Sequence, residues 1–315
     1  MSPLRQIFRA DSKLTDILAA QRFTLSAEVI PPRNGAQQAS VFSQIQALTE
    51  NGAQFLAVTK GAGGSLRGGS LPIAQAVKER FNAPCIAHFT CRDLTPHDVE
   101  NQLMDHHYFG IRNILALRGD PPDGNSTWNP REGSYQYAYQ LIEQIRSLNE
   151  GRYLDRQGGP SSDSQTQTDF CIGAAVYPEH PHEGERLKFF KLKVQAGAEY
   201  AITQMLFDPD AYARFMDLCA KNGIAVPVLP GTRLLKTQAQ ALRVAKKFEV
   251  SIPQALLNEL DSEETPDSVA RSVERFLRMT ERFKQLGAPG IHLFVLSDTA
   301  GASLALKQLR ELADG

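Results

Sequence analysis

The sequence has few cysteines and no pattern that would pair them. Its 315 residues include four, at Cys85, Cys91, Cys171 and Cys219, and none lies in a C-x-x-C pair or at the spacing of a zinc site. Three of them lie in apolar strand or helix patterns, which is typical of small buried thiols. We therefore expect free thiols and no metal held by cysteine, and a reducing cytoplasm suits such a chain.

Long apolar runs and an excess of either charge are also absent from the sequence. No window approaches about 18 consecutive apolar residues, so we expect no segment that spans a membrane. Charges at Arg5, Arg9, Asp11, Lys13 and Asp16 interrupt the N-terminal segment, unlike the apolar region of a signal peptide. Because 34 Lys and Arg stand against 35 Asp and Glu, with a net charge of −1, neither nucleic acid nor an anionic membrane is expected as a partner.

What the sequence does contain is a regular alternation of strand and helix patterns. Short apolar runs bounded by Gly, Pro or Asn predict eight strands. They lie at 23–30, 54–59, 84–91, 112–118, 170–177, 200–206, 225–230 and 290–296. Amphipathic windows that predict helices lie at 39–50, 71–81, 96–109, 135–148, 184–196, 209–222, 237–248 and 301–313.

Eight strands that are each followed by a helix predict an α/β protein. We expect one (β/α)8 barrel of the TIM type over residues 1–315, because a closed parallel sheet uses this alternation and this length. An extra helical segment is expected at about 253–286, before the last strand. The polar stretch at about 149–169 is interpreted as a flexible surface excursion within the barrel.

Polar side chains stand at the predicted carboxyl ends of six consecutive strands. They are Glu28, Thr59, His88, Arg118 with Asp120, Tyr177 and Gln204. In a barrel of this type these ends meet at one mouth, where the active site is built. Solubility alone would explain any one of these residues, but their convergence favours a site.

The individual residues allow both functional and structural interpretations. Glu28 lies in an apolar strand, where poor solvation disfavours its charged form and suits a general acid. An ion pair with an inward Arg or Lys explains Glu28 equally well. Asp120 could equally cap the backbone of its own turn, as Asp often does beside Gly. His88 could equally be a core histidine that is hydrogen-bonded within the protein. The Gln204 amide needs partners from the protein or from a ligand.

Two further segments only partly match ligand-binding motifs. The run from Gly61 to Ser65 lacks the spacing of a dinucleotide fingerprint and the Gly-Lys-Ser/Thr of a phosphate loop, so we expect a mobile loop beside the site. Residues 177–183 (YPEHPHE) contain histidines and carboxylates of the kind that ligate zinc. No third strong ligand is placed by spacing, and we expect no metal.

Six segments together resemble the methylenetetrahydrofolate reductase family, in its bacterial, flavin-dependent form. They read SAEVIPPRNG at 26–35, FLAVTKGAGGS at 55–65, CIAHFTCRD at 85–93, GIRNILALRGDPPDG at 110–124, AAVYPEHP at 174–181 and AGAEYAITQMLFD at 196–208. The resemblance implies a barrel that carries FAD and uses NADH or NADPH. Its reaction would convert 5,10-methylenetetrahydrofolate to 5-methyltetrahydrofolate, a step of one-carbon metabolism and methionine biosynthesis.

The resemblance also implies roles for individual residues. Glu28 would be the general acid, and Asp120 the catalytic carboxylate near the flavin and the pterin. Gln204, Gln240 and Asp120 would bind the folate substrate. Residues at positions that contact FAD are Thr59, His88, Arg118, Gly119, Asp120, Tyr137, Ala138, Tyr177, Lys193 and His180, with His182 as the alternative to His180.

Some positions depart from the family pattern. Lys60 stands where many members carry Tyr. Near the last strand, members often read Leu-Asn-Arg, with the arginine holding the folate tail, whereas residues 296–299 here read Leu-Ser-Asp-Thr. We therefore expect little preference for additional tail glutamates, unless Arg67 or Lys236 supplies the missing cation.

Two other functions remain open at this point. A Schiff-base lyase or aldolase would use Lys60 or Lys193, but it would give Glu28, Asp120 and Gln204 no joint role. A non-catalytic subunit that handles a folate or a corrinoid would keep the barrel and act only in a complex. The sequence does not decide between NADH and NADPH, and it is compatible with a homo-oligomer.

Overall fold

The computed structural model describes residues 8–21, 23–65, 68–122, 128–155, 166–179 and 182–314. Its eight parallel strands pair in chain order, and the last strand pairs with the first. They are β1 Thr24–Val29, β2 Phe55–Val58, β3 Cys85–Thr90, β4 Asn113–Leu117, β5 Cys171–Val176, β6 Tyr200–Met205, β7 Val228–Thr232 and β8 Gly290–Phe294. The predicted (β/α)8 barrel is thereby confirmed.

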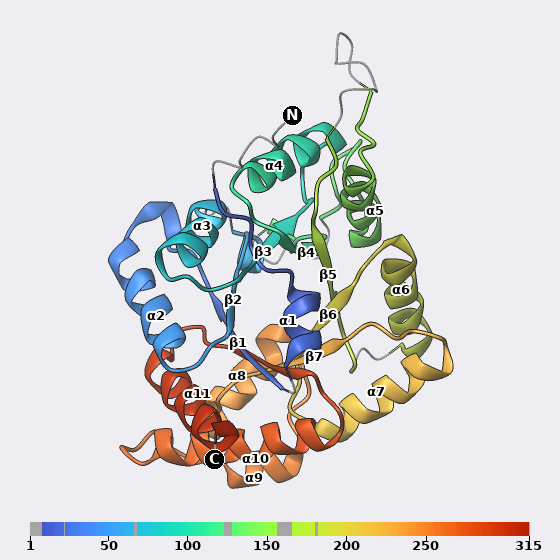
Figure 1. Cartoon of the computed structure of the whole chain (residues 1–315). Helices are drawn as coiled ribbons and strands as arrows, with labels where there is room; N and C mark the ends of the chain where they lie inside the picture. The colour runs from blue at the N-terminus through green and yellow to red at the C-terminus, as the bar shows by residue number, and fades with distance from the viewer. Residues whose placement is uncertain are drawn as a thin grey trace.

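Helices surround the ring of strands, except that the first of them lies over its centre (Figure 1). They are α1 Leu14–Ala20, α2 Gln38–Glu50, α3 Ser70–Arg80, α4 Pro96–Tyr108, α5 Ala138–Asn149, α6 Glu183–Ala196, α7 Pro209–Lys221, α8 Gln238–Phe248, α9 Gln254–Glu259, α10 Ser268–Gln285 and α11 Thr299–Asp314. The extra helical segment before β8 is present as two helices, α9 and α10. Most of the core lies between the strands and the helices.

Strand β7 differs from its predicted bounds of 225–230. The chain continues as a strand through Pro230 and Gly231, which were expected to end it. Gly231 makes this possible because a Cβ atom there would lie 2.4 Å from the Phe294 ring and 2.7 Å from the Thr203 carbonyl oxygen. The glycine thus serves close packing inside the barrel, where a sequence pattern indicates a turn.

The short helix α1, which the hydrophobic pattern did not predict, closes the N-terminal end of the barrel. The backbone N–H of Leu14 donates to the Asn113 side chain at the start of β4 (2.7 Å). Asp11 accepts from the backbone N–H of Cys85 at the start of β3 (2.8 Å). Leu14 and Leu18 pack with the apolar residues that fill the barrel, and α1 lies over the centre of the strand ring in Figure 1. The carboxyl ends of the strands therefore form the open mouth.

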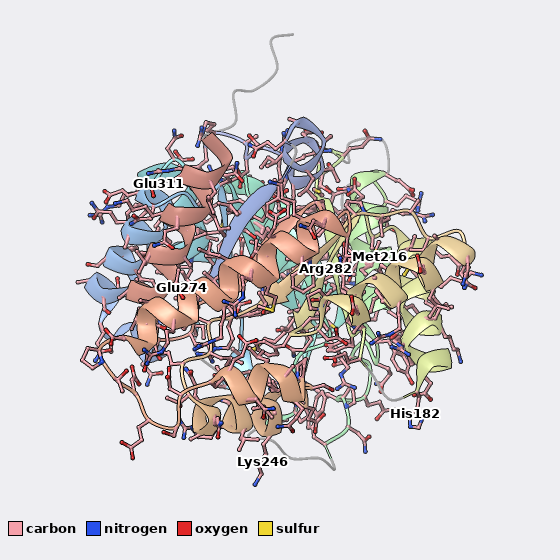
Figure 2. The ribbon with its side chains drawn as sticks, turned by 90° about the horizontal axis from the view of Figure 1, so that it is seen from below. His182, Met216, Lys246, Glu274, Arg282 and Glu311 are labelled. Carbon is pink, nitrogen blue, oxygen red and sulfur yellow. The ribbon has the colours of Figure 1, made fainter. Side chains whose placement is uncertain are left out.

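All four cysteines are buried free thiols, as predicted. Within the described part of the chain, no helix is both long and apolar enough to cross a membrane. Figure 2 shows the barrel from below, where α10 lies beside α7 and Arg282 of α10 faces that helix. The Arg282 guanidinium pairs with Asp210 there, at 3.2 Å.

Candidate active site

A buried carboxyl group and two histidines meet inside the barrel, toward its open mouth. The Oε2 atom of Glu28 on β1 lies 3.5 Å from Nε2 of His88 on β3 and 4.0 Å from Nε2 of His292 on β8. The exposed fractions of these residues are 8%, 7% and 1%. No Arg or Lys of the described residues pairs with Glu28, so the structural alternative of a Glu–Arg or Glu–Lys ion pair is not present here.

His292 is a site residue that the sequence analysis missed. A single histidine in an apolar strand indicates a core residue as readily as a site residue. Its alternation with Ile291 and Leu293, which pack outward against the helices, is the signal that could have placed it inside the barrel. The register of the closing strand pair then sets His292 opposite Ser26, two residues before Glu28.

Ser26 determines which nitrogen of His292 faces Glu28 as an acceptor. The Ser26 hydroxyl donates to the Ile291 carbonyl oxygen at 3.1 Å, and it lies 2.9 Å from Nδ1 of His292. Because a hydroxyl has one proton to donate, it accepts at the second contact, so Nδ1 of His292 carries the hydrogen. In the neutral ring, Nε2 then presents a lone pair toward Glu28.

His88 is the second imidazole beside Glu28. Burial lowers the pKa of His88, although the nearby Glu28 carboxylate acts in the opposite direction. The ring is therefore neutral at pH 7. Its buried Nε2 atom has no hydrogen-bond partner among the described residues.

Thr59 adds a second buried polar atom without a partner. It follows β2, is 4% exposed, and its backbone N–H donates to the Val29 carbonyl oxygen at 3.1 Å. Its Oγ1 atom has no hydrogen-bond partner in the described part of the chain. Buried polar atoms are nearly always paired in proteins, so the Oγ1 of Thr59 and the Nε2 of His88 are atoms that a ligand can satisfy.

Asp120 stands at the rim of the mouth and is fixed by the glycine-rich loop. The loop carries a 3₁₀ turn over Ala62–Gly64, and the backbone N–H of Gly63 donates to Oδ2 of Asp120 at 2.9 Å. Arg92, another residue that the sequence analysis missed, donates to the carbonyl oxygens of Gly64 (3.1 Å) and Asp120 (2.6 Å). The glycine-rich run therefore lies beside the site, as predicted, and its amide orients the carboxylate.

Aromatic rings and cationic side chains lie near the ends of β4 and β5. Tyr137 and Tyr177 are 44% and 47% exposed, unusually open for large rings. Tyr137 is the N-cap of α5 and stacks on Phe189 at 5.4 Å. Arg118 is exposed and makes no ion pair with any described residue. Lys193 donates to the Ala175 carbonyl oxygen at 2.7 Å, and burial lowers its pKa to about 8.

The two predicted folate-binding amides are both partly engaged by the protein. The Oε1 atom of Gln204, on β6, accepts from the backbone N–H of Met205 at 2.8 Å, which leaves its NH2 group for a ligand. The Oε1 atom of Gln240 accepts from the backbone N–H of Lys236 at 2.7 Å and so closes the turn into α8. Gln240 thus holds the loop after β7, whereas Gln204 lies on a strand of the barrel.

Lys60, the other lysine considered for a Schiff base, does not reach the mouth. Its Nζ atom donates to Oε1 of Gln102 on α4 at 2.7 Å and lies 4.0 Å from the centre of the Phe89 ring. Burial in this layer between strands and helices lowers the pKa of Lys60 to about 8. The altered pKa therefore reflects packing outside the barrel.

The position that departs from the family pattern, Asp298, forms an ion pair. Lys236 after β7 lies 3.3 Å from Oδ2 of Asp298 and 3.1 Å from Oε1 of Glu264. The candidate cation Lys236 is therefore already matched by two carboxylates. Arg67 and the predicted flavin residue His180 lie outside the described residues, and His182 is exposed just before α6.

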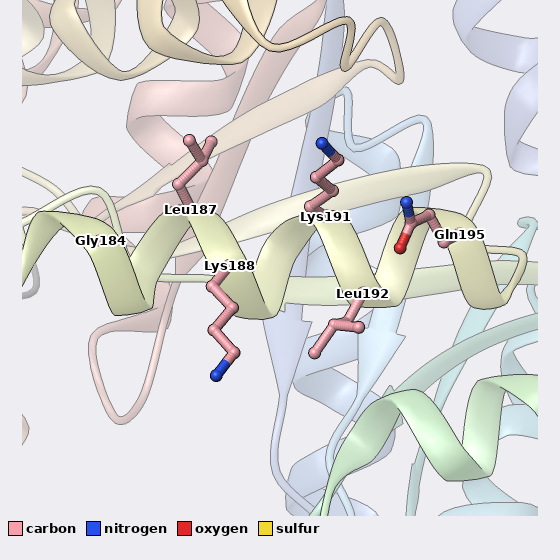
Figure 3. A pocket seen from close by; sticks show the side chains of 6 residues that line it. All are labelled: Gly184, Leu187, Lys188, Lys191, Leu192 and Gln195. Carbon is pink, nitrogen blue, oxygen red and sulfur yellow. The ribbon is translucent and has the colours of Figure 1, made fainter.

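The hollow along α6 is separate from this site. Its lining comes from that helix alone, and Lys188 and Lys191 point to opposite sides of it (Figure 3). Side chains that diverge in this way do not converge on one ligand.

Comparison with known proteins identifies the family of this chain. A family model described as methylenetetrahydrofolate reductase matches residues 13–310. The 5,10-methylenetetrahydrofolate reductase of Escherichia coli (strain K12) is 30% identical over 284 residues, which cover 88% of this chain and 87% of that protein. Methylenetetrahydrofolate reductase 1 of Schizosaccharomyces pombe is 29% identical over 296 residues, 92% of this chain and 46% of that protein.

The chain spans about half the length of its fungal and plant relatives. Methylenetetrahydrofolate reductase (NADH) 1 of Zea mays, for example, is 29% identical over 90% of this chain but only 48% of that protein. A solved structure with a TM-score of 0.62 and 14% identity covers 95% of this chain and 99% of its own; it is an uncharacterized protein from Clostridium thermocellum that binds two copies of 5-methyl-5,6,7,8-tetrahydrofolic acid. That likeness shows the fold. The family model and the E. coli relative show that this chain belongs to the methylenetetrahydrofolate reductase family.

Proposed function

We propose that this chain reduces 5,10-methylenetetrahydrofolate to 5-methyltetrahydrofolate, with FAD as its cofactor and NADH or NADPH as the reductant. The observation that carries the proposal is the buried carboxyl group of Glu28 between the two imidazoles of His88 and His292 at the barrel mouth. The family membership and the named activity of the E. coli relative support it. The folate bound by the Clostridium thermocellum protein of the same fold is also in agreement.

Glu28 is suited to deliver a proton to the folate. The methylene group of the substrate bridges two nitrogens, and one of its C–N bonds must open before the carbon accepts hydride. A proton on the departing nitrogen makes that opening possible. Oε2 of Glu28 lies 3.5 Å from Nε2 of His88 and 4.0 Å from Nε2 of His292, and no described Arg or Lys pairs with it, so the carboxyl group is left to serve the folate nitrogen. Glu28 is therefore assigned as the general acid.

Asp120 and Gln204 are suited to hold and stabilise the pterin. Opening of the C–N bond leaves a cation, and a carboxylate that is already oriented stabilises such a charge without reorganisation. The Gly63 amide orients Asp120 in this way. The free NH2 group of Gln204 can donate to an acceptor on the pterin ring.

The residues at the mouth also fit a flavin. The unpartnered Oγ1 of Thr59 and Nε2 of His88 offer hydrogen bonds to a ring system, and the open rings of Tyr137 and Tyr177 offer stacking surfaces. The N-terminus of α5 at Ala138, with Arg118 and Lys193 nearby in the fold, suits a pyrophosphate. Gly119, with φ of 99°, permits close approach of the backbone. When bound, the flavin supplies the hydride.

The visible spectrum of the purified protein tests this proposal. A flavin absorption band that NADH or NADPH bleaches, and that the methylenefolate restores, is the expected result. A colourless protein that forms a covalent adduct with a carbonyl substrate on borohydride treatment would instead support the lyase. A flavin band that no reduced nicotinamide bleaches would favour the non-catalytic subunit.

A further inference from the structure

A pocket that the proposed reaction does not use lies beside the loops that follow β6 and β7. It has a volume of about 300 Å³ and is lined by the start of α7, the loop after β7, and helices α9 and α10. Of the described residues, none of the mouth residues Glu28, His88, Asp120 and Gln204 lines it. Its volume is at the lower end of the range for small-molecule sites.

Arg233 brings a buried positive charge into this pocket. It directly follows β7 and is only 6% exposed. Its Nε donates a long hydrogen bond of 3.4 Å to the Leu234 carbonyl oxygen, and its two terminal nitrogens have no hydrogen bond or ion pair with any described residue. A guanidinium stays charged in proteins, and a buried charge without a partner is costly. The Asp298 carboxylate acts on this charge only through space, since no described carboxylate pairs with Arg233 within 4.0 Å, so the two terminal nitrogens are left for a ligand.

Arg275 of α10 adds a second unsatisfied donor to the same pocket. Its terminal nitrogens donate to the carbonyl oxygens of Glu259 (3.1 Å) and Leu235 (3.2 Å), and its nearest carboxylate, that of Asp261, lies 4.0 Å away. Its buried Nε has no partner among the described residues. Two arginines with unmet donors thus line one small space.

The carboxylates of the pocket are committed elsewhere. Glu259 pairs with Arg278 at 2.5 Å. Asp208 caps α7 and pairs with Arg214 at 3.1 Å. The remaining wall is apolar and includes Phe207, Leu235, Leu256, Phe276 and Met279. The pocket therefore offers cationic donors on one side and an apolar surface on the other.

From this arrangement we propose that the pocket binds a small organic anion, a phosphate ester or carboxylate with an apolar body, whose anionic group is held by Arg233 and Arg275. Arginine suits this task because its fork of donors matches the oxygens of both groups. None of the residues assigned to the folate lines the pocket, so we expect its ligand to be a molecule other than the folate that undergoes reduction.

Binding of phenyl phosphate to the purified chain tests the proposal without any assay of activity. Isothermal titration should show binding to the wild type that weakens with added salt, and benzyl alcohol, which has no charge, should not bind. Arg233→Leu should weaken phenyl phosphate binding at least about tenfold, as expected for loss of a charged hydrogen bond. Arg282→Leu, which removes an exposed arginine from the same helix as Arg275, should bind like the wild type.

A second variant and a folate-binding control distinguish loss of the anion site from misfolding and from damage to the folate site. Arg233→Gln should lose phenyl phosphate binding as Arg233→Leu does. If only one of the two variants folds, that variant alone is sufficient for the test. The affinity for 5-methyltetrahydrofolate should be unchanged in both. Absence of wild-type binding, or equal binding by the Arg233 variants, would overturn the proposal. A parallel loss of 5-methyltetrahydrofolate affinity would also overturn it, because the pocket would then be part of the folate site.

Discussion

Replacement of Glu28 by glutamine should separate the two half-reactions of the proposed reaction. Glutamine has nearly the same shape as glutamate, so it fits the same space between His88 and His292. It cannot release a proton to the folate nitrogen. The free energy of unfolding should therefore change little, whereas folate reduction should be strongly slowed.

The expected size of the effect follows from the position of the carboxyl group. Glu28 is 8% exposed, so bulk water is a poor substitute as the proton donor. The His88 imidazole beside it is neutral, because burial lowers its pKa, so it does not replace a carboxylic acid. A positioned general acid contributes about 10²–10⁴-fold, which corresponds to about 3–5 kcal/mol of activation free energy.

Stopped-flow spectroscopy of the flavin band measures both half-reactions. In Glu28→Gln, bleaching by NADH should keep its wild-type rate, and reoxidation by methylenetetrahydrofolate should be about 10²–10⁴-fold slower. Glu311→Gln, the same chemical change at an exposed residue of α11, should leave both rates unchanged. Near-normal reoxidation in Glu28→Gln would refute the assignment of the acid, and equal slowing of both steps would indicate damage to the flavin pocket.

Other predictions concern the mouth rim, the barrel base and the folate tail. Asp120→Asn keeps the hydrogen bond from Gly63 but removes the charge, so reoxidation by folate should slow more than bleaching; equal slowing of the two steps would contradict this role. Burial raises the pKa of Asp11 from 3.8 to about 6, so the folded state binds this proton more tightly, and its contribution to the free energy of unfolding should fall by about 3 kcal/mol between about pH 4 and pH 6. Urea unfolding at a series of pH values should show that this fall is missing in Asp11→Asn, and identical curves would exclude it. Because Lys236 is already paired with Asp298 and Glu264, added tail glutamates should improve folate affinity only slightly; a large gain that salt abolishes, measured with mono- and polyglutamylated folate, would show another clamp.

The sequence by itself determined the elements and most of the residues at the mouth. Hydrophobic periodicity depends on neighbours along the chain, so the eight strands and their helices could be predicted close to their observed bounds. The strand ends placed Glu28 and His88 in the same site because a closed parallel barrel brings all such ends together. The strand that was misplaced, β7, is the one in which Gly231 serves packing rather than a turn.

Only the tertiary structure decided which groups touch. Ser26 and His292 are 266 residues apart in sequence, and they meet because β8 closes the barrel against β1. No local pattern encodes that register. The direction of Lys60 toward α4, the pairing of Lys236 with Asp298 and the burial of Arg233 beside α10 likewise depend on how helices pack on strands. The periodicity of the sequence fixes which face of an element is buried, but the partner of a charged group on that face depends on contacts between distant segments, which form only when the barrel closes.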